Sequence, residues 1–470
     1  MIAEELAEWG TSPVEVPDGV RAAALRYLLD GVGTALGGLR TGMVAAECDE
    51  PSPIPAVAVA RALGGPPEAT IIGSRDRVGA PAAALANGTL VHTLDFDDTH
   101  ASGLVHATTV VLPAAFAVGE QVGATGRAVL DAAVVGYETV CRVAAAAPHG
   151  FHARGLHATM VAGVFSSAIV AARLLGHDAA RTVDALGIAG SQAGGLLAFL
   201  HSGASTKQLH PGFAAHAGIL AARLAAAGAS GPANVFDGPH GVYDALAAGT
   251  VDLASVTADL GTRWETTRIG IKPYPACQLS HAAIDAVGDA MRRSGFRPGG
   301  FGPGDVAAID VDVHPDSVPT VCDTRRDLAR PASPYAAKFS LPWSVAAAVV
   351  DGDLTTATYE PDSLGRPEVE RVARLVRWHV TPTGGAAADA PGTARITLTD
   401  GSTITGSVPR STGGPDNPLT DEQLVAKFHG NAGGDDSTHL VDLLHRLEEL
   451  DTIEPLMAAL AAAGTGRDRP

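Results

Sequence analysis

The sequence of 470 residues has little cysteine, few aromatic residues and few charged ones. Its four cysteines, Cys48, Cys141, Cys277 and Cys322, are far apart and form no C-x-x-C pair, which argues against a disulfide framework or a zinc knuckle. Aromatic residues make up 4% and charged residues 18% of the chain, whereas hydrophobic residues make up 46%. The interior must therefore consist mostly of Ala, Val and Leu, a composition that favours closely packed helices.

Positive charge is also scarce. The chain has 33 basic and 51 acidic side chains, a formal net charge of -18, which works against unspecific binding to nucleic acid or to an anionic membrane. The N-terminus, MIAEELAEWG, carries acids where a secretory signal carries positive charge, and the apolar segment 160–175 is too short to span a bilayer. We therefore expect a cytoplasmic protein with no nucleic-acid or membrane partner, in which a local site holds any anionic ligand.

Several common motifs are missing. The chain has no P-loop, no G-x-S-x-G elbow and no H-E-x-x-H pair, which argues against a nucleotide-dependent, serine-hydrolase or zinc-peptidase function. Gly31 and Gly33, followed by Gly37-Gly38, match a dinucleotide-binding loop only in part, and they follow a helical pattern rather than a strand.

The pattern of hydrophobic residues divides the chain into three parts. From residue 20 to 260, Ala-rich segments of helical length alternate with Gly, Pro, Asp and His clusters, as in a large helical domain. After about residue 268 the pattern changes. Residues 306–314 alternate with period two, and residues 394–408 predict a hairpin around Asp400-Gly401.

Helices are predicted at 338–351 and 368–374 within this middle part, and again from Leu419 onward. The fold class is therefore mainly α, with a smaller α+β domain. We place the helical part at residues 1–268, the α+β domain at residues 269–410 and a second helical part at residues 411–470. The last part could rejoin the first, which would make the α+β domain an insertion, but the pattern does not require it.

The densest polar cluster places three acids and three histidines within 15 positions, between His92 and His106. One interpretation is a proton-transfer site, since carboxylates can orient and tune a histidine. A second is a divalent-metal site with Asp97 and Asp98 as Mg²⁺ ligands. A third is a helix end at which acids cap backbone N–H groups. The residues by themselves leave all three open.

Three further clusters lie at predicted helix starts. His157 follows Arg154 before a long apolar segment, at a position where helix N–H groups favour an anion. Lys207, in TKQLHPG, precedes the next Ala-rich helix and could neutralise a carboxylate. The segment IKPYPACQLSH forms a stiff hinge between the predicted domains and ends at His281, which opens a helix. The alternative for each is a loop histidine or a surface lysine without a function.

Taken together and in this order, the clusters resemble the MmgE/PrpD family, which includes 2-methylcitrate dehydratase, cis-aconitate decarboxylase and iminodisuccinate epimerase. The similar stretches run from about residue 20 to 430 and include ANGTLVHTLDFDDTH, RGLHATMVAGVF, ALGIAGSQAGGL, TKQLHPGFAAHAGILAARLA, IKPYPACQLSHAAIDA, AKFSLPWSVAAAV and NPLTDEQLVAKF. The resemblance implies a helical domain made from both ends of the chain, an α+β lid domain, a homodimer, and an active site between the domains that needs no metal or organic cofactor.

Carried over position by position, the resemblance also implies a set of site residues. The catalytic ones are Asp95, Thr99, His106, His157, Lys207 and His281. The substrate-binding ones are Arg154, Lys272 and Gln192. Asp95 and Thr99 are four residues apart and would share a helical face if the preceding helix continued through them. The chain departs from the family at His106-Ala-Thr, where relatives commonly have His-Pro-Ser or His-Pro-Gly.

The reaction that we predict is removal of a proton next to a carboxylate and loss of water from a 2-methylcitrate-like hydroxy polycarboxylate. In this scheme Lys207 and His157 stabilise the enolate-like charge, and one of His106 and His281 serves as the base and the other as the acid. The same residues would serve cis-aconitate-type decarboxylation or iminodisuccinate-type epimerisation. Because the sequence shows no complete set of arginines for a tricarboxylate, a tailoring enzyme for a specialised metabolite is a further alternative.

Overall fold

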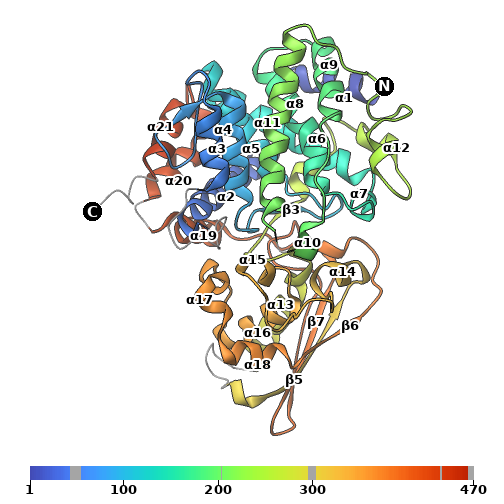
Figure 1. The fold of residues 1–470 in the computed structure, drawn as a ribbon, viewed down its shortest axis with the longest axis vertical. Coiled ribbons are helices and arrows are strands. Elements are labelled where there is room, and N and C mark those ends of the chain that lie inside the picture. Colours follow the sequence, from blue (N-terminus) through green and yellow to red (C-terminus); the bar gives the residue numbers. More distant parts are fainter. Residues whose placement is uncertain (43–53, 203, 295–302, 435–436, 464–470) are drawn as a thin grey trace.

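The computed structural model of this protein describes residues 1–42, 54–202, 204–294, 303–434 and 437–463. Two units lie one beyond the other along the long axis, a large helical unit and a smaller unit in which helices cover a sheet (Figure 1). Their main hydrophobic cores are separate. One core is built from residues 2–271 and 419–460, and the other from residues 276–396. Segments from both ends of the chain therefore share one core.

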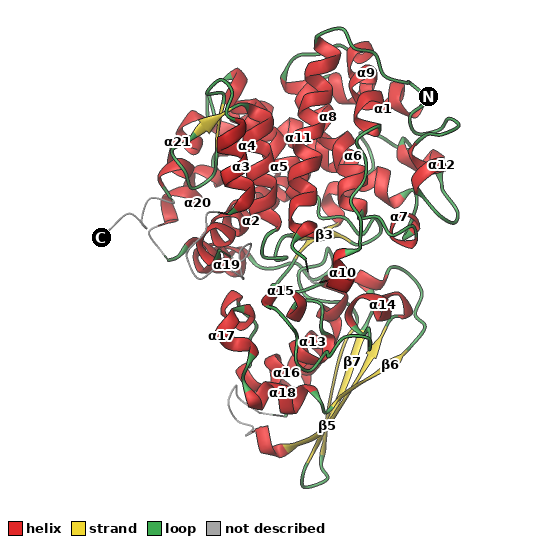
Figure 2. Ribbon diagram, in the orientation of Figure 1, coloured by secondary structure: helices red, strands yellow, loops and turns green. Residues whose placement is uncertain are grey.

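The helical unit consists mainly of long helices with short connections (Figure 2). In chain order they are α1 (Ile2–Thr11), α2 (Asp18–Thr41), α3 (Pro55–Leu63), α4 (Ala80–His92), α5 (Thr108–Val122), α6 (Gly126–Ala145), α8 (Ala158–Leu174), α9 (Ala179–Gly190) and α11 (Thr206–Ala226). The short ones are α7 (Gly150–Ala153), α10 (Phe199–Ser202) and α12 (Val242–Leu246), and the C-terminal ones are α19 (Asp421–Ala432), α20 (Thr438–His445) and α21 (Glu454–Ala462). The expected mainly helical fold is confirmed.

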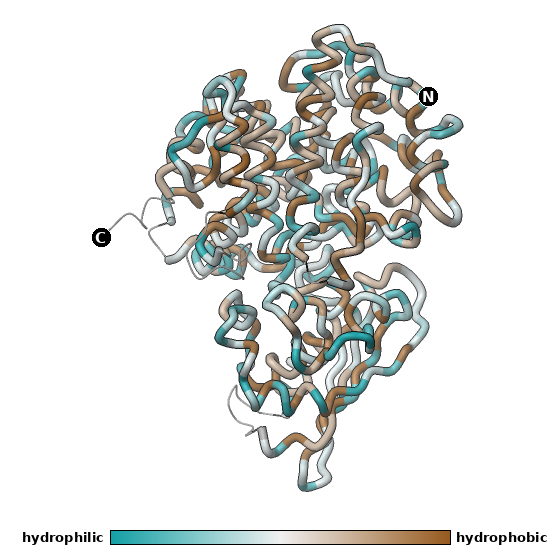
Figure 3. Tube along the Cα trace, in the orientation of Figure 1, coloured by the Kyte–Doolittle hydropathy of each residue, from teal (hydrophilic) through white to brown (hydrophobic). Residues whose placement is uncertain are grey.

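Several of these helices are buried on every side. All residues of α4 are buried, and hydrophobic residues follow the central helices in Figure 3. Helix α4 crosses α11 so closely that a Cβ atom on Gly88 would come within 2.9 Å of the Gly212 backbone. Nearer the site, the Gln208 amide donates to the Thr93 carbonyl at 3.2 Å. This antiparallel contact brings the end of α4 to the start of α11.

The C-terminal segment packs back onto the first part of the chain. Helix α19 lies against α2, where a Cβ atom on Gly33 would meet the Phe428 ring at 2.9 Å. The buried Lys427 ammonium lies 2.7 Å from the Asp30 carboxylate of α2. Because burying this ion pair costs desolvation energy, it requires a close fit between the two helices.

The smaller unit has a four-stranded sheet in the order β6-β5-β7-β8. The strands are β5 (Val306–Val313), β6 (Val376–Val380), β7 (Gly392–Leu398) and β8 (Thr403–Val408), with β5 and β6 parallel and the other pairs antiparallel. Helices packed with the sheet or with one another are α13 (His281–Arg293), α16 (Leu341–Asp351) and α18 (Pro367–Ala373), and shorter ones are α14 (Val318–Val321), α15 (Pro334–Ala337) and α17 (Pro361–Leu364). The hairpin predicted around Asp400-Gly401 is confirmed.

A short antiparallel pair joins the chain segments on either side of the junction. Strand β3 (Asp98–His100) pairs with β4 (Ile269–Ile271), so the loop after α4 lies beside the segment that enters the smaller unit. A second small pair consists of β1 (Ala69–Thr70) and β2 (Arg77–Val78). The β3–β4 pair brings the first polar cluster of the sequence to the last one.

None of the helices in the described residues is long and apolar enough to cross a membrane.

Candidate active site

A small cavity lies where the two units meet. Its volume is about 70 Å³. The residues that line it are Asp95, Leu104, His106, His152, His157, Leu197, Phe199, Leu200, Lys207, Cys277, Gln278, Leu279, Thr320 and Phe339. Acidic, basic and imidazole groups therefore share this small space with leucine and phenylalanine side chains.

The basic and imidazole groups stand at helix starts. Lys207 is the second residue of α11, His157 is the N-cap residue of α8, and His106 precedes the N-cap residue of α5. The first N–H groups of a helix have no partner within that helix, and the helix dipole is positive at this end. Three such ends beside one cavity favour an anionic ligand.

Asp95 is held by two lysines. Its Oδ1 atom lies 3.0 Å from Lys207 Nζ and 2.6 Å from Lys272 Nζ, which also donates to the Asp95 carbonyl at 3.1 Å. The backbone of Asp95 is left-handed, with φ of 50°, a conformation that costs roughly 1–2 kcal/mol in a residue with a side chain. Burial raises the pKa of Asp95, but the charges of Lys207 and Lys272 outweigh it, so the pKa lies well below its usual value.

Asp97 is held by two histidines instead. His92 Nδ1 lies 3.0 Å from Asp97 Oδ1, and His106 Nδ1 lies 3.1 Å from Asp97 Oδ2. His106 Nδ1 is also 2.8 Å from the Asp98 carbonyl. Because a carbonyl oxygen only accepts hydrogen bonds, Nδ1 of His106 carries the proton. Nε2 of the neutral ring therefore has a free lone pair. His106 thus offers Nε2 for proton transfer.

The histidines around the cavity are neutral in the free protein. Burial, with smaller contributions from the Lys272 and Lys207 charges, lowers the pKa of His106. His157 Nδ1 lies 3.1 Å from His210 Nδ1, so one ring donates to the other. Burial, with the neighbouring His210 charge, brings the pKa of His157 well below its usual value, and burial lowers that of His210 to about 4. A bound anion would raise these pKa values again.

Asp98 has turned away from this group. Its carboxylate accepts hydrogen bonds from the Thr108 backbone N–H, at 3.1 Å, and from the Thr108 hydroxyl. Burial raises the pKa of Asp98 to about 7, with Asp97 adding to the rise. Asp98 therefore joins β3 to the start of α5 and does not line the cavity.

The structure brings together most of the residues predicted from the sequence. Asp95, His106, His157 and Lys207 line the cavity. Thr99 lies behind it, with Oγ1 at 3.3 Å from His106 Nδ1. The expectation that Asp95 and Thr99 share a helical face is wrong, because α4 ends at His92 and Thr99 belongs to strand β3.

The other predicted residues do not line the cavity. His281 is fully buried behind it and donates through Nε2 to the Ala276 carbonyl at 3.0 Å. Arg154 is exposed and bonds to the Ala247 carbonyl, whereas Gln192 bonds to a carbonyl of α11. Lys272 is buried and reaches the cavity only through Asp95. Sequence spacing places these residues near the site but does not show which side chains face it.

Several residues at the site were missed by the sequence reasoning. His152 lines the cavity, and Asp97, His92 and His210 support the histidines. All of them stand within the clusters that the sequence singles out, so cluster membership was the available signal. The apolar wall of the cavity, which includes Phe199 from α10 and Phe339, carries no such signal, because isolated phenylalanines occur throughout a core.

Lys427 was also missed. Its Nζ donates to the Phe96 carbonyl at 2.7 Å and to the Lys272 carbonyl at 2.9 Å, besides its pairing with Asp30. The ammonium lies 4.0 Å from the centre of the Phe96 ring. One side chain from the C-terminal segment therefore ties together the two backbone stretches that carry Asp95, Asp97 and Lys272.

Two groups of side chains could hold a metal ion. The ligand atoms of His92, Asp95, Asp97 and His106 lie within 4.8 Å of one another, as do those of His92, His106 and His157. In the first group Lys207 and Lys272 already supply positive charge to Asp95. Among the described residues, neither group includes Asp98, so the pair of Mg²⁺ ligands proposed from the sequence does not converge.

Taken together, these features define a mainly helical protein whose cavity suits a small anion and provides groups for proton transfer. Comparison with known proteins identifies the family. The MmgE/PrpD N-terminal domain matches residues 4–253 and the MmgE/PrpD C-terminal domain matches residues 274–441. The chain belongs to the MmgE/PrpD family, which confirms the resemblance seen in its motifs.

Three similar proteins have cis-aconitate decarboxylase in their names. The chain is 28% identical to the cis-aconitate decarboxylase of Aspergillus terreus (strain NIH 2624 / FGSC A1156), with 98% of this chain and 96% of that protein covered. It is 29% identical to the cis-aconitate decarboxylase-like protein oryM of Aspergillus oryzae, with the same shares covered. It is also 29% identical to the cis-aconitate decarboxylase of Mus musculus, over 80% of this chain and 78% of that protein.

Proposed function

We propose that this protein is a lyase that decarboxylates a small unsaturated polycarboxylate of the cis-aconitate type. The observation that carries the proposal is the mixed lining of the cavity. Lys207, His106 and His157 stand at helix N-termini, and other lining residues, such as Phe199 and Phe339, are apolar. The names of the relatives support the same reaction.

The reaction needs a proton donor and a stabilised intermediate charge. In an acid of this type, one carboxylate is on the saturated carbon next to the C=C bond. The bond to that carboxylate breaks, CO2 leaves, and the electron pair becomes a new C=C bond. The former π pair moves to the far alkene carbon and takes up a proton there. One proton is consumed for each CO2 released, and no oxidant or reductant is required.

The polar and the apolar lining residues each have a part in this scheme. Charge develops on the far carbon and its carboxylate, where Lys207 and the helix N-termini stabilise it. The carboxylate that leaves loses its charge as CO2 forms, which the apolar residues favour because they solvate an anion poorly. His106 Nε2 delivers the proton. Because the ring is neutral in the free protein, its proton is taken up with the anionic substrate, whose charge raises the pKa of the ring.

A second candidate is the elimination of water from a hydroxy polycarboxylate such as 2-methylcitrate. The low pKa of His106, caused by burial and then by Lys272, favours it, because a neutral imidazole can abstract the proton next to a carboxylate without first losing one. His106 Nε2 would be the base, and Lys207 would stabilise the enolate-like charge.

The experiment that separates these reactions is NMR in D2O with the purified chain and cis-aconitate, 2-methylcitrate, citrate and iminodisuccinate. We expect CO2 release from cis-aconitate, with one deuterium on carbon in the product. Alkene formation from a hydroxy acid alone would favour the second candidate, and deuterium uptake without net loss would indicate an epimerase. No reaction with any of the four would overturn both candidates and favour a specialised substrate.

A parallel series with a chelator tests the metal alternative. Turnover that persists after exhaustive chelation would exclude a Mg²⁺-dependent reaction at Asp97. Turnover that is lost on chelation and restored by Mg²⁺ would replace the scheme above with a metal-assisted one.

A further inference from the structure

A second, larger cavity adjoins the candidate active site. Its volume is about 390 Å³, compared with about 70 Å³ for the inner one. The two cavities share Phe199, Leu200 and Phe339 as lining residues. The inner cavity is the smaller of the two, and a polycarboxylate bound there has room to extend past the phenylalanines into the outer cavity.

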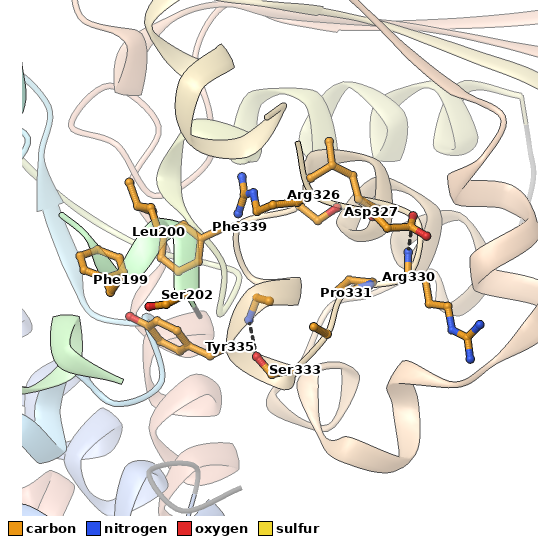
Figure 4. A pocket seen from close by; sticks show the side chains of 14 residues that line it. Phe199, Leu200, Ser202, Arg326, Asp327, Arg330, Pro331, Ser333, Tyr335 and Phe339 are labelled. Atoms are coloured by element: carbon orange, nitrogen blue, oxygen red, sulfur yellow. Dashed lines mark hydrogen bonds between the residues drawn. The ribbon is translucent and has the colours of Figure 1, made fainter. Parts of the chain in front are cut away.

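The outer cavity is lined by a cation, Arg326, whose ion-pair partner Asp323 lies 4.0 Å from its Nε atom. The Arg326 guanidinium points toward Phe339 and Leu200, whereas Arg330 points away (Figure 4). Nη2 of Arg326 donates to the Thr320 carbonyl at 2.5 Å, and Thr320 lines the inner cavity. Within the described residues, Nε of Arg326 is buried and has no hydrogen-bond partner.

The nearby acids are engaged elsewhere. Asp323 accepts two bonds from Arg325, each of 2.9 Å, and its nearer oxygen is 4.0 Å from Arg326 Nε. Asp327 accepts the backbone N–H groups of Ala329 and Arg330. The charge of Arg326 is therefore available to a ligand.

Tyr335 is a second unused donor in the same cavity. Its side chain is 7% exposed, and its hydroxyl has no hydrogen-bond partner in the part of the chain that the structure describes. A buried hydroxyl without a partner is unfavourable, so a ligand that accepts a hydrogen bond from it here is stabilised. Arginine and a tyrosine hydroxyl together suit a carboxylate.

We propose that Arg326 binds the substrate carboxylate that is remote from the reacting carbons, with Tyr335 as a further donor elsewhere in the same cavity. This inference rests on the proposed function and sharpens it: the substrate is a polycarboxylate long enough to reach from His106 and Lys207 to Arg326. A compact monocarboxylate would fill only the inner cavity. Arg326 supplies the carboxylate-binding arginine that could not be recognised in the sequence, because nothing in its neighbourhood there distinguishes it from Arg325 or Arg330.

The test is binding rather than turnover. Calorimetry compares tricarballylate, a saturated tricarboxylate that cannot react, with methylsuccinate and glutarate, which each lack one of its carboxylates. In Arg326→Met we expect tricarballylate affinity to fall about 10–100-fold, the range for a charge-assisted hydrogen bond. For the dicarboxylate that lacks the remote group, the same substitution should change affinity less than threefold. Arg330→Met, which alters an outward-pointing arginine of the same cavity, should bind tricarballylate like the unmodified protein.

Other variants separate binding from folding. Arg326→Lys keeps the charge and should recover part of the lost affinity, and Tyr335→Phe should weaken tricarballylate binding more than dicarboxylate binding. Equal losses for all three acids, an unchanged affinity in Arg326→Met, or no tricarballylate binding by the unmodified protein would overturn the inference. If tricarballylate binds as expected but none of the four candidate substrates reacts, the proposed function fails and the carboxylate site stands.

Discussion

Asp95 and Asp97 are two residues apart in one loop, yet they are neutralised in different ways. Asp95 contacts the ammonium groups of Lys207 and Lys272, whereas Asp97 contacts the imidazoles of His92 and His106. Ammonium groups paired with a carboxylate stay charged over the physiological pH range, whereas buried imidazoles gain or lose a proton as their surroundings change.

The difference assigns separate tasks to the two sides. The lysine side has a fixed positive charge. Burial lowers the pKa of Lys272, but Asp95 and the other partners together outweigh burial, so this pKa lies above its usual value. The histidine side can move a proton. A reaction that changes the charge of a carboxylic acid needs both a constant positive charge and a mobile proton. In this loop Asp95 holds the lysines with the constant charge, and Asp97 holds the histidines that can carry the proton.

The largest effect is expected on the histidine side. In the proposed reaction His106 transfers the proton, so His106→Gln should lower kcat about 10²–10⁴-fold. Steady-state kinetics with the substrate found by NMR would measure it. His216→Gln is the matched control, since His216 is a histidine of α11 whose ring bonds to the Pro81 carbonyl. A kcat of His106→Gln within threefold of the control would remove His106 from the scheme.

On the lysine side, Lys207→Met should lower kcat/KM about 10²–10³-fold, the usual loss when one donor to a developing charge is removed. Lys207→Arg keeps the charge in a different shape and should lose less. If both variants lost activity equally, the shape of the ammonium rather than its charge would be the important property.

Asp97→Asn tests how the two sides differ. Removal of the supporting carboxylate should reduce kcat about 10–100-fold, as is usual for an outer partner of a functional histidine. The charge of Asp97 raises the pKa of His106, so its removal should lower that pKa. If His106 acts as an acid, the alkaline limb of the pH–rate profile moves to lower pH; if it acts as a base, the acidic limb does. A profile that does not move would show that Asp97 does not act through His106.

A smaller effect is expected where Lys427 joins the two backbone stretches. Replacing only one member of the buried Lys427–Asp30 pair leaves an uncompensated charge and costs about 3–5 kcal/mol of stability. The double variant Lys427→Met with Asp30→Leu avoids this, so we expect a melting temperature near that of the unmodified protein. Its kcat should still fall about 10-fold or more, because the Phe96 and Lys272 carbonyls lose their donor and the loop can shift. Unchanged kcat would make Lys427 a packing residue only.

The smallest effect is on stability at mildly acid pH. Burial, followed by the charge of Lys272, lowers the pKa of His281 to about 3, below the value of ~6.5 for an unfolded histidine. Between these values the unfolded chain binds a proton that the folded one does not. The free energy of unfolding should therefore fall as pH drops below about 6.5, by up to ~1.4 kcal/mol per pH unit for this residue.

Asp98 and Asp30 act with the opposite sign, because burial raises their pKa values to about 7 and about 6. The contribution of His281 is therefore measured as the difference in the pH dependence of stability between the unmodified protein and a His281 variant. Urea unfolding at pH 7.5, 6.0 and 5.0 should show a steeper loss of stability in the unmodified protein than in His281→Asn. Parallel curves would contradict the buried neutral state of His281.

How far the site could be predicted depends on the kind of residue. His157 and His281 were placed correctly at helix starts, because apolar periodicity reports where a helix begins. Lys207 was expected to precede its helix but lies in the first turn of α11, which begins at Thr206 and continues through Pro211. Whether each side chain faces the cavity was not predictable. His281 begins α13 as expected but points to the Ala276 carbonyl, since the rotation of a helix about its axis is set by packing against its neighbours.

The loop between α4 and α5 shows the same limit. Its three acids have three different partners: two lysines for Asp95, two histidines for Asp97 and a threonine for Asp98. Neighbouring acids in a sequence look alike, and only the path of the backbone, with Asp95 left-handed and Asp98 in a strand, separates their directions.

The sequence by itself determined the mainly helical class, the family and the segments that carry polar chemistry, because composition, periodicity and motif order are local properties of the chain. The tertiary structure alone decided which groups meet. Lys272, Arg326 and Lys427 come from parts of the chain far from Asp95, and each takes its role from contacts that folding creates. A charge has a function only through the groups within a few ångströms of it, and for a long chain that neighbourhood is fixed by packing.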